Sequence, residues 1–334
     1  MQLFRHSLKF GVVVILLCPS FSARSQSSGP RSLRQQLTFL CDNNFFLLNG
    51  EDGYYTSGMF LKYDRVSKKS SNISKKILSY EIGQEIYNAH ARKILRAPNS
   101  RFPGGIEEID RPIAGYLFGK ITRSSFYNDK RLLTLGFSIG TVGKNSFGQD
   151  VQEFWHRVIG VKDYWNWVWD YQVSNEVGAN LHVTFANALL SRDQDFIQIT
   201  PITQATLGTT FTNVSQAFLM QIGRLRPMSS STFWNSRVQL PNEQSHGQLV
   251  EMFLFYKPSI KYQLYNATIQ GGMFTTNKGP ILSDVQPFVI AHEVGLRFST
   301  PRFGLGYHMV FQGKEAKSQF YQQSFASIVG SICF

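Results

Sequence analysis

Apolar side chains recur at every second position through most of this chain. The alternation is clearest in three stretches, residues 133–140, 176–185 and 288–298. In the first stretch, Leu133, Leu135, Phe137 and Ile139 alternate with threonine, glycine and serine, and in the third His292 falls on the apolar side. Because successive side chains of a β-strand point to opposite faces, the pattern predicts strands with one apolar face and one small or polar face.

The candidate strands are longer than those of ordinary soluble sheets. About a dozen of them run for roughly ten residues, the length that a tilted strand needs to cross a bilayer, whereas soluble strands average about five or six. The chain also stops at Phe334 on an alternating strand, which resembles the assembly signal of outer-membrane barrels. These features favour an all-β fold, an antiparallel transmembrane β-barrel of about 12 strands, over a soluble β-sandwich, which would also alternate.

Aromatic residues make up 14% of the chain and cluster where candidate strands end. The clusters are Tyr54-Tyr55, Phe126-Tyr127, Trp165 to Trp169, and Phe253, Phe255 and Tyr256. Clusters of this kind are typical of the aromatic girdles that membrane barrels place at the two membrane interfaces. We therefore interpret them as girdle residues.

The first residues have the order of a secretory signal. Arg5 and Lys9 precede an apolar run that ends at Cys18, and small residues follow up to Ala23. The run is too short for a spanning helix, so we expect a signal peptide at residues 1–23, a loose mature N-terminus at 24–36 and the barrel at 37–334. A buried N-terminal strand is the alternative reading.

Two cysteines, Cys41 and Cys333, remain after the signal and lie at opposite ends of the mature chain. The first and last strands of a closed barrel are neighbours, so a disulfide between these cysteines depends on the strand register. Two cysteines do not form the disulfide framework that stabilises small secreted domains.

The chain is basic, with 34 lysines and arginines against 22 acidic residues and a formal charge of +12. Such a charge is compatible with nucleic acid, but an exported protein meets the phosphates of a lipid surface instead. The composition and the alternation exclude a disordered tail, a coiled coil and a helical membrane bundle. We expect outer-membrane lipids as partners, no nucleic acid, and a monomer.

One segment breaks the strand pattern. Residues 148–160 have helical spacing, with Val151, Trp155, Val158 and Ile159 on one side, and Asn145 or Ser146 is available as an N-cap. We expect a short helix here in an extracellular loop. Loops on rigid scaffolds are frequent sites of function.

Two polar side chains of that helix, Gln152 and His156, are four residues apart and share a face. Histidine suits general-base catalysis near neutral pH, although a single histidine on a tryptophan-rich helix is more often a packed structural residue. The sequence contains no Gly-x-Ser-x-Gly nucleophile motif and no histidine or cysteine spacing typical of a metal site.

A second polar cluster, Asp42-Asn43-Asn44, follows an apolar strand and precedes the segment Tyr54 to Gly58. The simple reading is a strand that leaves the membrane at its polar rim. In a regular strand Asn43 and Asn44 face opposite sides, so both could join one site only if the chain bends or bulges there.

Five segments in order resemble the LpxR-like outer-membrane lipid A deacylase family. They are Asp42-Asn43-Asn44-Phe45-Phe46, Tyr55-Thr56-Ser57-Gly58, Gly83-Gln84-Glu85-Ile86-Tyr87, Asp110-Arg111-Pro112-Ile113-Ala114-Gly115-Tyr116, and Val151-Gln152-Glu153-Phe154-Trp155-His156-Arg157-Val158-Ile159-Gly160. The match covers residues 41 to about 180, nearly half of the chain, and the remainder matches only as generic barrel strands.

The resemblance implies a 12-stranded barrel that removes the acyl chains at the 3-position of lipid A with the help of calcium. By motif position His156 would activate water, and Asn43, Asn44, Thr56 and Gln152 would lie around the scissile ester. Calcium would polarise the ester carbonyl, with Asp42 and Asn44 near the ion. Asn44 replaces an aspartate of the family, which removes a carboxylate from the implied calcium site.

Arg92 and Lys93 only approximately match a family lysine that would hold lipid A phosphates, and a solvated basic loop is an equally good interpretation. The leading hypothesis is an outer-membrane ester hydrolase acting on lipid A. The alternatives are a barrel that binds lipopolysaccharide or conducts solutes without catalysis, and an outer-membrane phospholipase.

Overall fold

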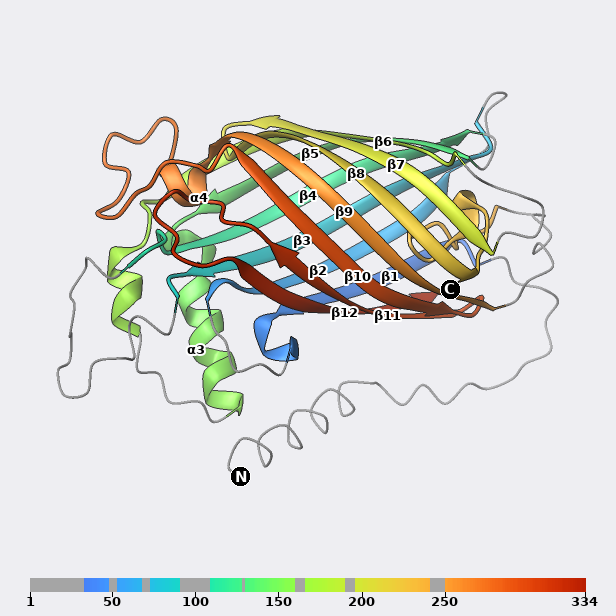
Figure 1. The fold of residues 1–334 in the computed structure, drawn as a ribbon, viewed down its shortest axis with the longest axis horizontal. Helices are drawn as coiled ribbons and strands as arrows, with labels where there is room; N and C mark the ends of the chain where they lie inside the picture. Colours follow the sequence, from blue (N-terminus) through green and yellow to red (C-terminus); the bar gives the residue numbers. More distant parts are fainter. Residues whose placement is uncertain are drawn as a thin grey trace.

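A computed structural model of the chain describes residues 33–47, 53–67, 73–90, 109–127, 130–159, 166–189, 196–240 and 250–334. Each strand pairs antiparallel with the next, and the last pairs with the first, so twelve strands form a closed barrel (Figure 1). They are β1 (Gln35–Asn43), β2 (Tyr54–Ser67), β3 (Lys75–Asn88), β4 (Ala114–Tyr127), β5 (Arg131–Val142), β6 (Glu176–Asn187), β7 (Ile197–Gly208), β8 (Phe211–Arg224), β9 (Glu251–Asn266), β10 (Phe288–Ser299), β11 (Phe303–Gln312) and β12 (Gln323–Cys333). The predicted barrel is confirmed.

The outer wall of the barrel is apolar, as the alternation predicts. Leu135, Phe137 and Ile139 of β5 and Leu181 and Phe185 of β6 are all exposed on the outside. An apolar outer band with a polar interior is the arrangement that lipid requires of a barrel wall. None of the described helices has the length and apolarity needed to cross a bilayer.

The two ends of the barrel differ. The start of β1 and the C-terminus lie at one end, which we call the terminal end, and helix α3 (Gly148–Ile159) and the four-residue helix α4 (Ala267–Gln270) lie at the other, the helix end (Figure 1). Most of the longer connections are at the helix end. Because outer-membrane barrels have short periplasmic turns and longer extracellular loops, the helix end is the extracellular one.

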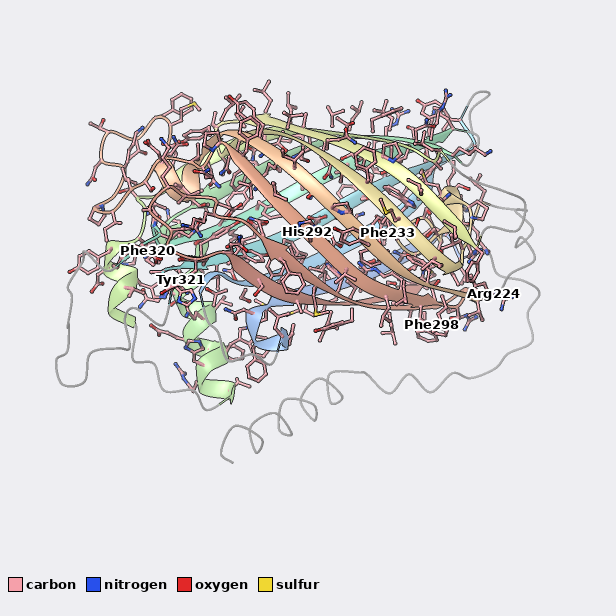
Figure 2. All side chains as sticks on the ribbon, viewed as in Figure 1. Arg224, Phe233, His292, Phe298, Phe320 and Tyr321 are labelled. Carbon is pink, nitrogen blue, oxygen red and sulfur yellow. The ribbon has the colours of Figure 1, made fainter. Side chains whose placement is uncertain are left out.

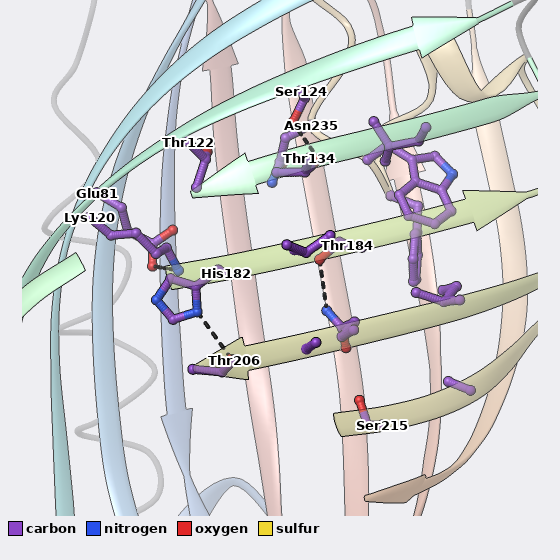
Figure 3. A pocket seen from close by; sticks show the side chains of 18 of the residues that line it. Glu81, Lys120, Thr122, Ser124, Thr134, His182, Thr184, Thr206, Ser215 and Asn235 are labelled. Carbon is purple, nitrogen blue, oxygen red and sulfur yellow. Dashed lines mark hydrogen bonds and ion pairs between the residues drawn. The ribbon is translucent and has the colours of Figure 1, made fainter. Parts of the chain in front are cut away.

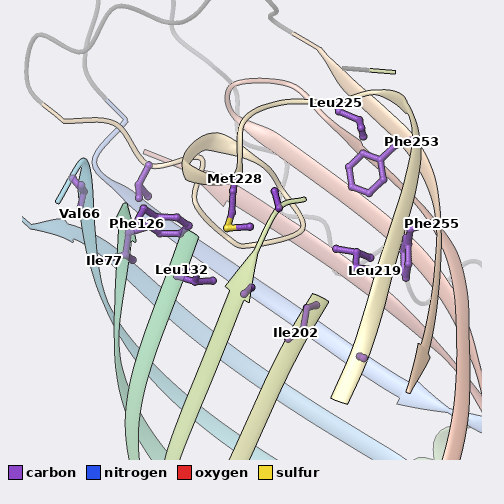
Figure 4. Close-up of a cluster of buried hydrophobic side chains, with 14 residues drawn as sticks. Val66, Ile77, Phe126, Leu132, Ile202, Leu219, Leu225, Met228, Phe253 and Phe255 are labelled. Atoms are coloured by element: carbon purple, nitrogen blue, oxygen red, sulfur yellow. The ribbon is translucent and has the colours of Figure 1, made fainter. Parts of the chain in front are cut away.

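The segment 225–240, which includes the short helix η5 (Met228–Ser230), folds back into the terminal end and closes it. Met228 and Val238 are completely buried there against the inner faces of the strands (Figure 4). The Lys75 ammonium group, only 2% exposed, donates hydrogen bonds to the carbonyls of Ser229 and Val238, both at 2.8 Å. We call residues 225–240 the plug.

Several aromatic residues that the sequence analysis interprets as girdle residues are buried instead. Tyr54 and Phe126 are fully buried, Phe253 and Phe255 pack with the plug, and Trp169 lies beneath α3. These assignments were wrong because position at a strand end does not show whether a side chain points into the lumen or into lipid.

The register separates the two cysteines. Cys41 pairs with Ile328 and Cys333 pairs with Gln36, so the two thiols lie at different heights of the β1–β12 pair and both are free. The disulfide that the sequence left open is absent. The barrel begins at Gln35, two residues before the predicted boundary, and the predicted signal peptide lies outside the described residues.

Candidate active site

The chain turns sharply at the end of β1, and this turn separates the three polar residues of the first motif. Asp42 points into the lumen, where its two carboxylate oxygens accept hydrogen bonds from the hydroxyls of Tyr55 at 2.8 Å and Ser327 at 2.6 Å. Asn43 points outward, and its side-chain oxygen accepts the backbone N–H of Phe45 at 2.8 Å. The side chains of Asp42 and Asn43 therefore lie on opposite faces of the barrel wall.

Asn44 is the first residue of the short helix η1 (Asn44–Leu47) and is 5% exposed. This helix packs on the outside of β12, and the Tyr307 hydroxyl donates to the Phe46 carbonyl at 3.1 Å. From the sequence, Asn43 and Asn44 could share a site only if the chain bends between them, and this bend is present. It places η1 on the outer wall.

Strand β2 contains a bulge beside η1. The pairing with β3 shifts between Tyr55 and Ser57, and Tyr54 has a positive φ of 61°. Because a bulge adds one residue to a strand, it redirects the side chain at that position. Tyr55 points into the lumen, and Thr56, 6% exposed, faces the outer wall.

Helix α3 is held against the outside of β3 and β4 by a close backbone approach. A Cβ on Gly115 would lie 2.0 Å from the Ser146 Oγ, and a Cβ on Gly148 would lie 3.1 Å from the Gly115 Cα. Gln84 donates to the Ser146 carbonyl at 2.6 Å. Helix α3 begins at Gly148 and the Ser146 hydroxyl donates to the Gly143 carbonyl, so neither Asn145 nor Ser146, the two cap candidates from the sequence, occupies the N-cap position.

Asn88, the last residue of β3, connects the barrel to the helix. Its side-chain amide donates to the Thr56 hydroxyl at 3.1 Å and to the Gln152 carbonyl oxygen at 3.0 Å. The indole N–H of Trp169, in the short helix η4 (Asn166–Tyr171), also donates to that Gln152 oxygen, at 3.2 Å. The Asn88 Oδ1 atom is buried and has no hydrogen-bond partner among the described residues. The network therefore leaves one buried acceptor for a ligand, a water or an ion.

This network lies outside the barrel, on the side that faces lipid. The next outward residue of β3, Ile86, is 2% exposed because it is covered by a cluster that includes Val151 of α3 and Trp169. His156 lies one helical turn beyond Gln152, on the same face of α3, and is half-buried. Arg92 and Lys93 lie outside the described residues.

A separate polar region lies inside the lumen. A cavity of about 490 Å³ is lined by charged and hydroxyl side chains, including the Glu81–Lys120 ion pair at 2.7 Å, and the plug residues Phe233 and Trp234 also line it (Figure 3). Next to it the Ser138 hydroxyl and the His182 Nε2 are 2.9 Å apart. The barrel wall separates this cavity from the surrounding lipid, so the outer-wall network is the better candidate for chemistry on a membrane lipid.

Residues 10–334 match the family described as Outer membrane protein LpxR. The chain belongs to the LpxR family. The family resemblance stated from the five motifs is therefore confirmed, and it extends over the C-terminal half, which the motifs alone do not reach. No curated protein is similar enough to count as a relative of the chain.

Among solved structures, LpxR from Salmonella typhimurium superposes with a TM-score of 0.68 at 19% identity, covering 90% of this chain and all of that one. At this identity the match shows the fold. The beta domain of the Bordetella autotransporter Brka, with a TM-score of 0.44 at 7% identity, and the KdgM porin, with 0.39 at 8%, each match 90% of this chain and nearly all of their own. As a member of the LpxR family, the chain is an outer-membrane β-barrel.

Two members of the network were missed from the sequence. Asn88 directly follows the third motif, and the expected outward alternation after Ile82 and Ile86 could have placed it on the outer face. Trp169 was interpreted as a girdle residue. No spacing rule connects either residue to Gln152, because the contact depends on how α3 folds onto β3.

Proposed function

We propose that this member of the LpxR family is an outer-membrane hydrolase that removes 3-position acyl chains from lipid A. The observation that carries the proposal is the location of the Asn88 network, on the outer wall at the extracellular end. Lipid A occupies the outer leaflet, so its acyl esters lie at this height and beside this wall. A site in the lumen would require the lipid to leave the bilayer.

In the proposed reaction a water molecule attacks the ester carbonyl carbon. His156 accepts a proton from the water as the new C–O bond forms, and it returns that proton to the sugar oxygen as the ester C–O bond breaks. The products are a free fatty acid and lipid A with a hydroxyl at the 3-position. Gln152 and Asn43 would contribute amide groups around the ester, and Thr56 a hydroxyl.

We include calcium in the proposal because of the family resemblance. The described residues offer the oxygen ligands that calcium prefers, but they do not form a carboxylate site. The buried Asn88 Oδ1, the Thr56 hydroxyl and the Asn44 amide offer oxygen ligands, which calcium prefers. The Asp42 carboxylate is engaged in the lumen, and the described residues contain no group of three or more acidic, histidine or cysteine side chains that could hold a metal. We therefore propose a weak calcium site without a carboxylate. Bound calcium would polarise the ester carbonyl.

Arg92 and Lys93 are proposed to contact the phosphates of lipid A. Both belong to the connection between β3 and β4, which follows Asn88 and the described residues Ala89 and His90. Charge-assisted hydrogen bonds from such residues would orient the headgroup while the acyl chains remain in the membrane.

The second candidate is a barrel that binds lipopolysaccharide without cleaving it, and Asn44 is the observation that favours it. Loss of the family carboxylate is the change expected if catalysis has lapsed. Solute conduction has less support, because the plug fills the terminal end of the lumen.

The two candidates are separated by a lipid A deacylation assay on refolded protein across calcium concentrations. We expect the parent chain to release fatty acid, His156→Ala to abolish release, and Asn44→Asp to reach the same rate at lower calcium because it restores a carboxylate. Activity that appears only in Asn44→Asp would support the non-catalytic candidate. Equal activity in the parent and His156→Ala would contradict the proposed base.

A further inference from the structure

The lipid-facing wall opposite the candidate active site is not uniformly apolar. The outward residues of β9 and β10 form pairs that run from the helix end to the terminal end: Tyr262–Phe288, Ile260–Ile290, Pro258–His292, Tyr256–Val294, Leu254–Leu296 and Met252–Phe298. Two polar residues, His292 and Tyr256, occupy the two central pairs. Figure 2 shows His292 about halfway between Phe320 and Tyr321 near one end and Arg224 at the other.

His292 and Tyr256 form a hydrogen-bonded unit on this wall. The Tyr256 hydroxyl and the His292 Nδ1 are 2.7 Å apart, and the two rings are parallel within 1°. The other ring nitrogen of His292, Nε2, has no partner within the part of the chain that the structure describes. In either tautomer this nitrogen is a polar atom that faces outward.

The neighbouring strands carry a second outward polar pair. The Thr203 hydroxyl of β7 donates to the Gln216 side-chain oxygen of β8 at 2.7 Å, and the Gln216 amide nitrogen donates to the Ala217 carbonyl at 3.0 Å, which leaves one amide hydrogen for a further partner. Gln216 pairs with Ile260 of β9, so it is one pair nearer the helix end than His292. We call the outward side of β7 to β10, with Thr203, Gln216, Tyr256 and His292, the β7–β10 face.

Lipid does not satisfy polar atoms at this depth. Midway through the hydrocarbon there are only acyl chains, whereas lipid esters, hydroxyls and phosphates lie near the interfaces. The outward side chains of β5 and β6 follow the ordinary rule, since Leu135, Phe137, Leu181 and Val183 are apolar. The polar pairs of the β7–β10 face therefore indicate contact with another protein surface.

We propose that the β7–β10 face is where two copies of this chain associate. A two-fold axis along the membrane normal keeps both copies at the same height, so each Tyr256–His292 unit meets its own counterpart. The His292 Nε2 of one copy then hydrogen-bonds to the Tyr256 oxygen of the other, and the remaining amide hydrogen of each Gln216 is available to the facing copy. Such polar contacts are what drives association in lipid, where apolar contacts gain no hydrophobic energy.

The location of this face leaves the candidate active site free. In the closed strand order, β8 and β9 lie six strands away from β2 and β3, on the opposite side of the barrel. Both sites of the dimer thus face open membrane. The inference does not rest on the proposed enzymatic function, and it replaces the monomer that the sequence analysis expects.

Cysteine cross-linking in outer membranes tests the proposal. In a chain with Cys41→Ser and Cys333→Ser, Val294→Cys places a thiol at the centre of the face, and Leu135→Cys on β5 places a matched thiol away from it. We expect oxidation to give a disulfide-linked species of two copies, identified by mass, with Val294→Cys and not with Leu135→Cys. Absent or equal cross-linking, or a product that contains a different protein, would overturn the proposal.

A second measurement links the contact to the polar residues. Adding His292→Leu and Gln216→Leu to the Val294→Cys chain should reduce the cross-linked fraction several-fold. The heat-dependent shift of folded barrels on gels verifies that these variants fold. If folded variants cross-link as efficiently as their parent, the polar pairs do not hold the copies together and the proposal is wrong.

Discussion

Adjacent residues on one strand have opposite environments in this barrel. Asp42 and Asn43 follow each other in β1, yet Asp42 joins a hydroxyl network in the lumen and Asn43 begins the turn on the outer wall. Because neighbouring strand residues point to opposite faces, adjacency in a strand motif does not place two side chains in one site. The same rule assigns Asn88 to the outer wall together with Ile86.

Asn88→Ala tests the outer-wall network at single-residue scale. Removing the amide takes away the link between Thr56 and Gln152, so the positions of α3 and His156 become less defined. We expect the deacylation kcat to fall by roughly tenfold or more, with a smaller change in KM, because positioning acts on the reacting geometry. Asn213→Ala, which removes a lumen-lining amide, should leave the rate unchanged.

An Asn88→Ala chain that fails to fold would also lose activity. The heat-dependent gel shift is therefore measured in parallel to verify that the variant folds. A folded Asn88→Ala protein with the parent's kcat would show that the network does not position the catalytic groups.

The extracellular loops are joined to one another by a buried ion cluster. Arg111, between β3 and β4, is fully buried and donates to the Thr268 hydroxyl of α4 at 3.1 Å. Its guanidinium lies 3.9 Å from Glu315, between β11 and β12, and the Lys261 ammonium lies 2.7 Å from the same carboxylate. Three connections that are distant in sequence thus share one charged centre, close to the end of the barrel where α3 docks.

The Glu315 cluster predicts acid sensitivity of these loops. Burial alone would raise the pKa of Glu315, but Lys261 and Arg111 outweigh it and hold the pKa below its ordinary value. Because the folded-state pKa of Glu315 is lower than the ordinary glutamate value of about 4.3, the ion cluster stabilises the fold fully above that value. This stabilisation is lost as the pH falls through the lower folded-state pKa. Hydrogen exchange of residues 313–322 should therefore accelerate, beyond its intrinsic pH dependence, only in strong acid.

Glu315→Gln is the matched control for that measurement. Without the carboxylate these loops should exchange faster already at neutral pH and should show no additional transition in acid. A parent chain and a Glu315→Gln chain with the same pH profile would exclude the ion cluster as the cause.

The whole molecule is a barrel with packed clusters near both ends of its interior and a polar cavity between them. Aromatic side chains around Tyr87, Tyr116 and Phe118 pack in its extracellular half, and the plug closes the terminal end. Arg237 of the plug donates to the Thr300 carbonyl at 2.9 Å and to the Ser331 hydroxyl at 2.6 Å, which ties it to the strands around it. The lumen therefore serves as a rigid scaffold for the outer wall, where the proposed active site lies.

Loosening the plug should turn the barrel into a pore. Lys75→Met leaves the Ser229 and Val238 carbonyls without their donor, at a cost of about 1 to 3 kcal/mol for each buried group. Combined with Arg237→Met, it should give frequent channel openings in planar bilayers, where the parent chain shows few. Lys62→Met, which removes a lumen lysine that is paired with Asp64 and not with the plug, is the control. Silent bilayers with the folded double variant would mean that the lumen is closed by other segments.

The sequence by itself determined the barrel. The period-two alternation in the stretches 133–140, 176–185 and 288–298 is imposed by the contact of each strand with lipid on one side, and helical spacing marked α3 with Gln152 and His156 on one face. Both patterns are local, because they reflect which side of a single element is apolar. The family motifs then supplied the polar residues that we propose for the chemistry.

Only the tertiary structure decided which of these residues meet. The bulge at Thr56 and the turn after Asn43 move side chains from one face of the wall to the other, and the docking of α3 through Gly115 and Gly148 brings Asn88 and Trp169 to Gln152. The same holds for the separation of Cys41 from Cys333 and for the polar pairs of the β7–β10 face, both of which follow from register. Register and docking depend on contacts between elements that are distant in the chain, and no local pattern encodes them.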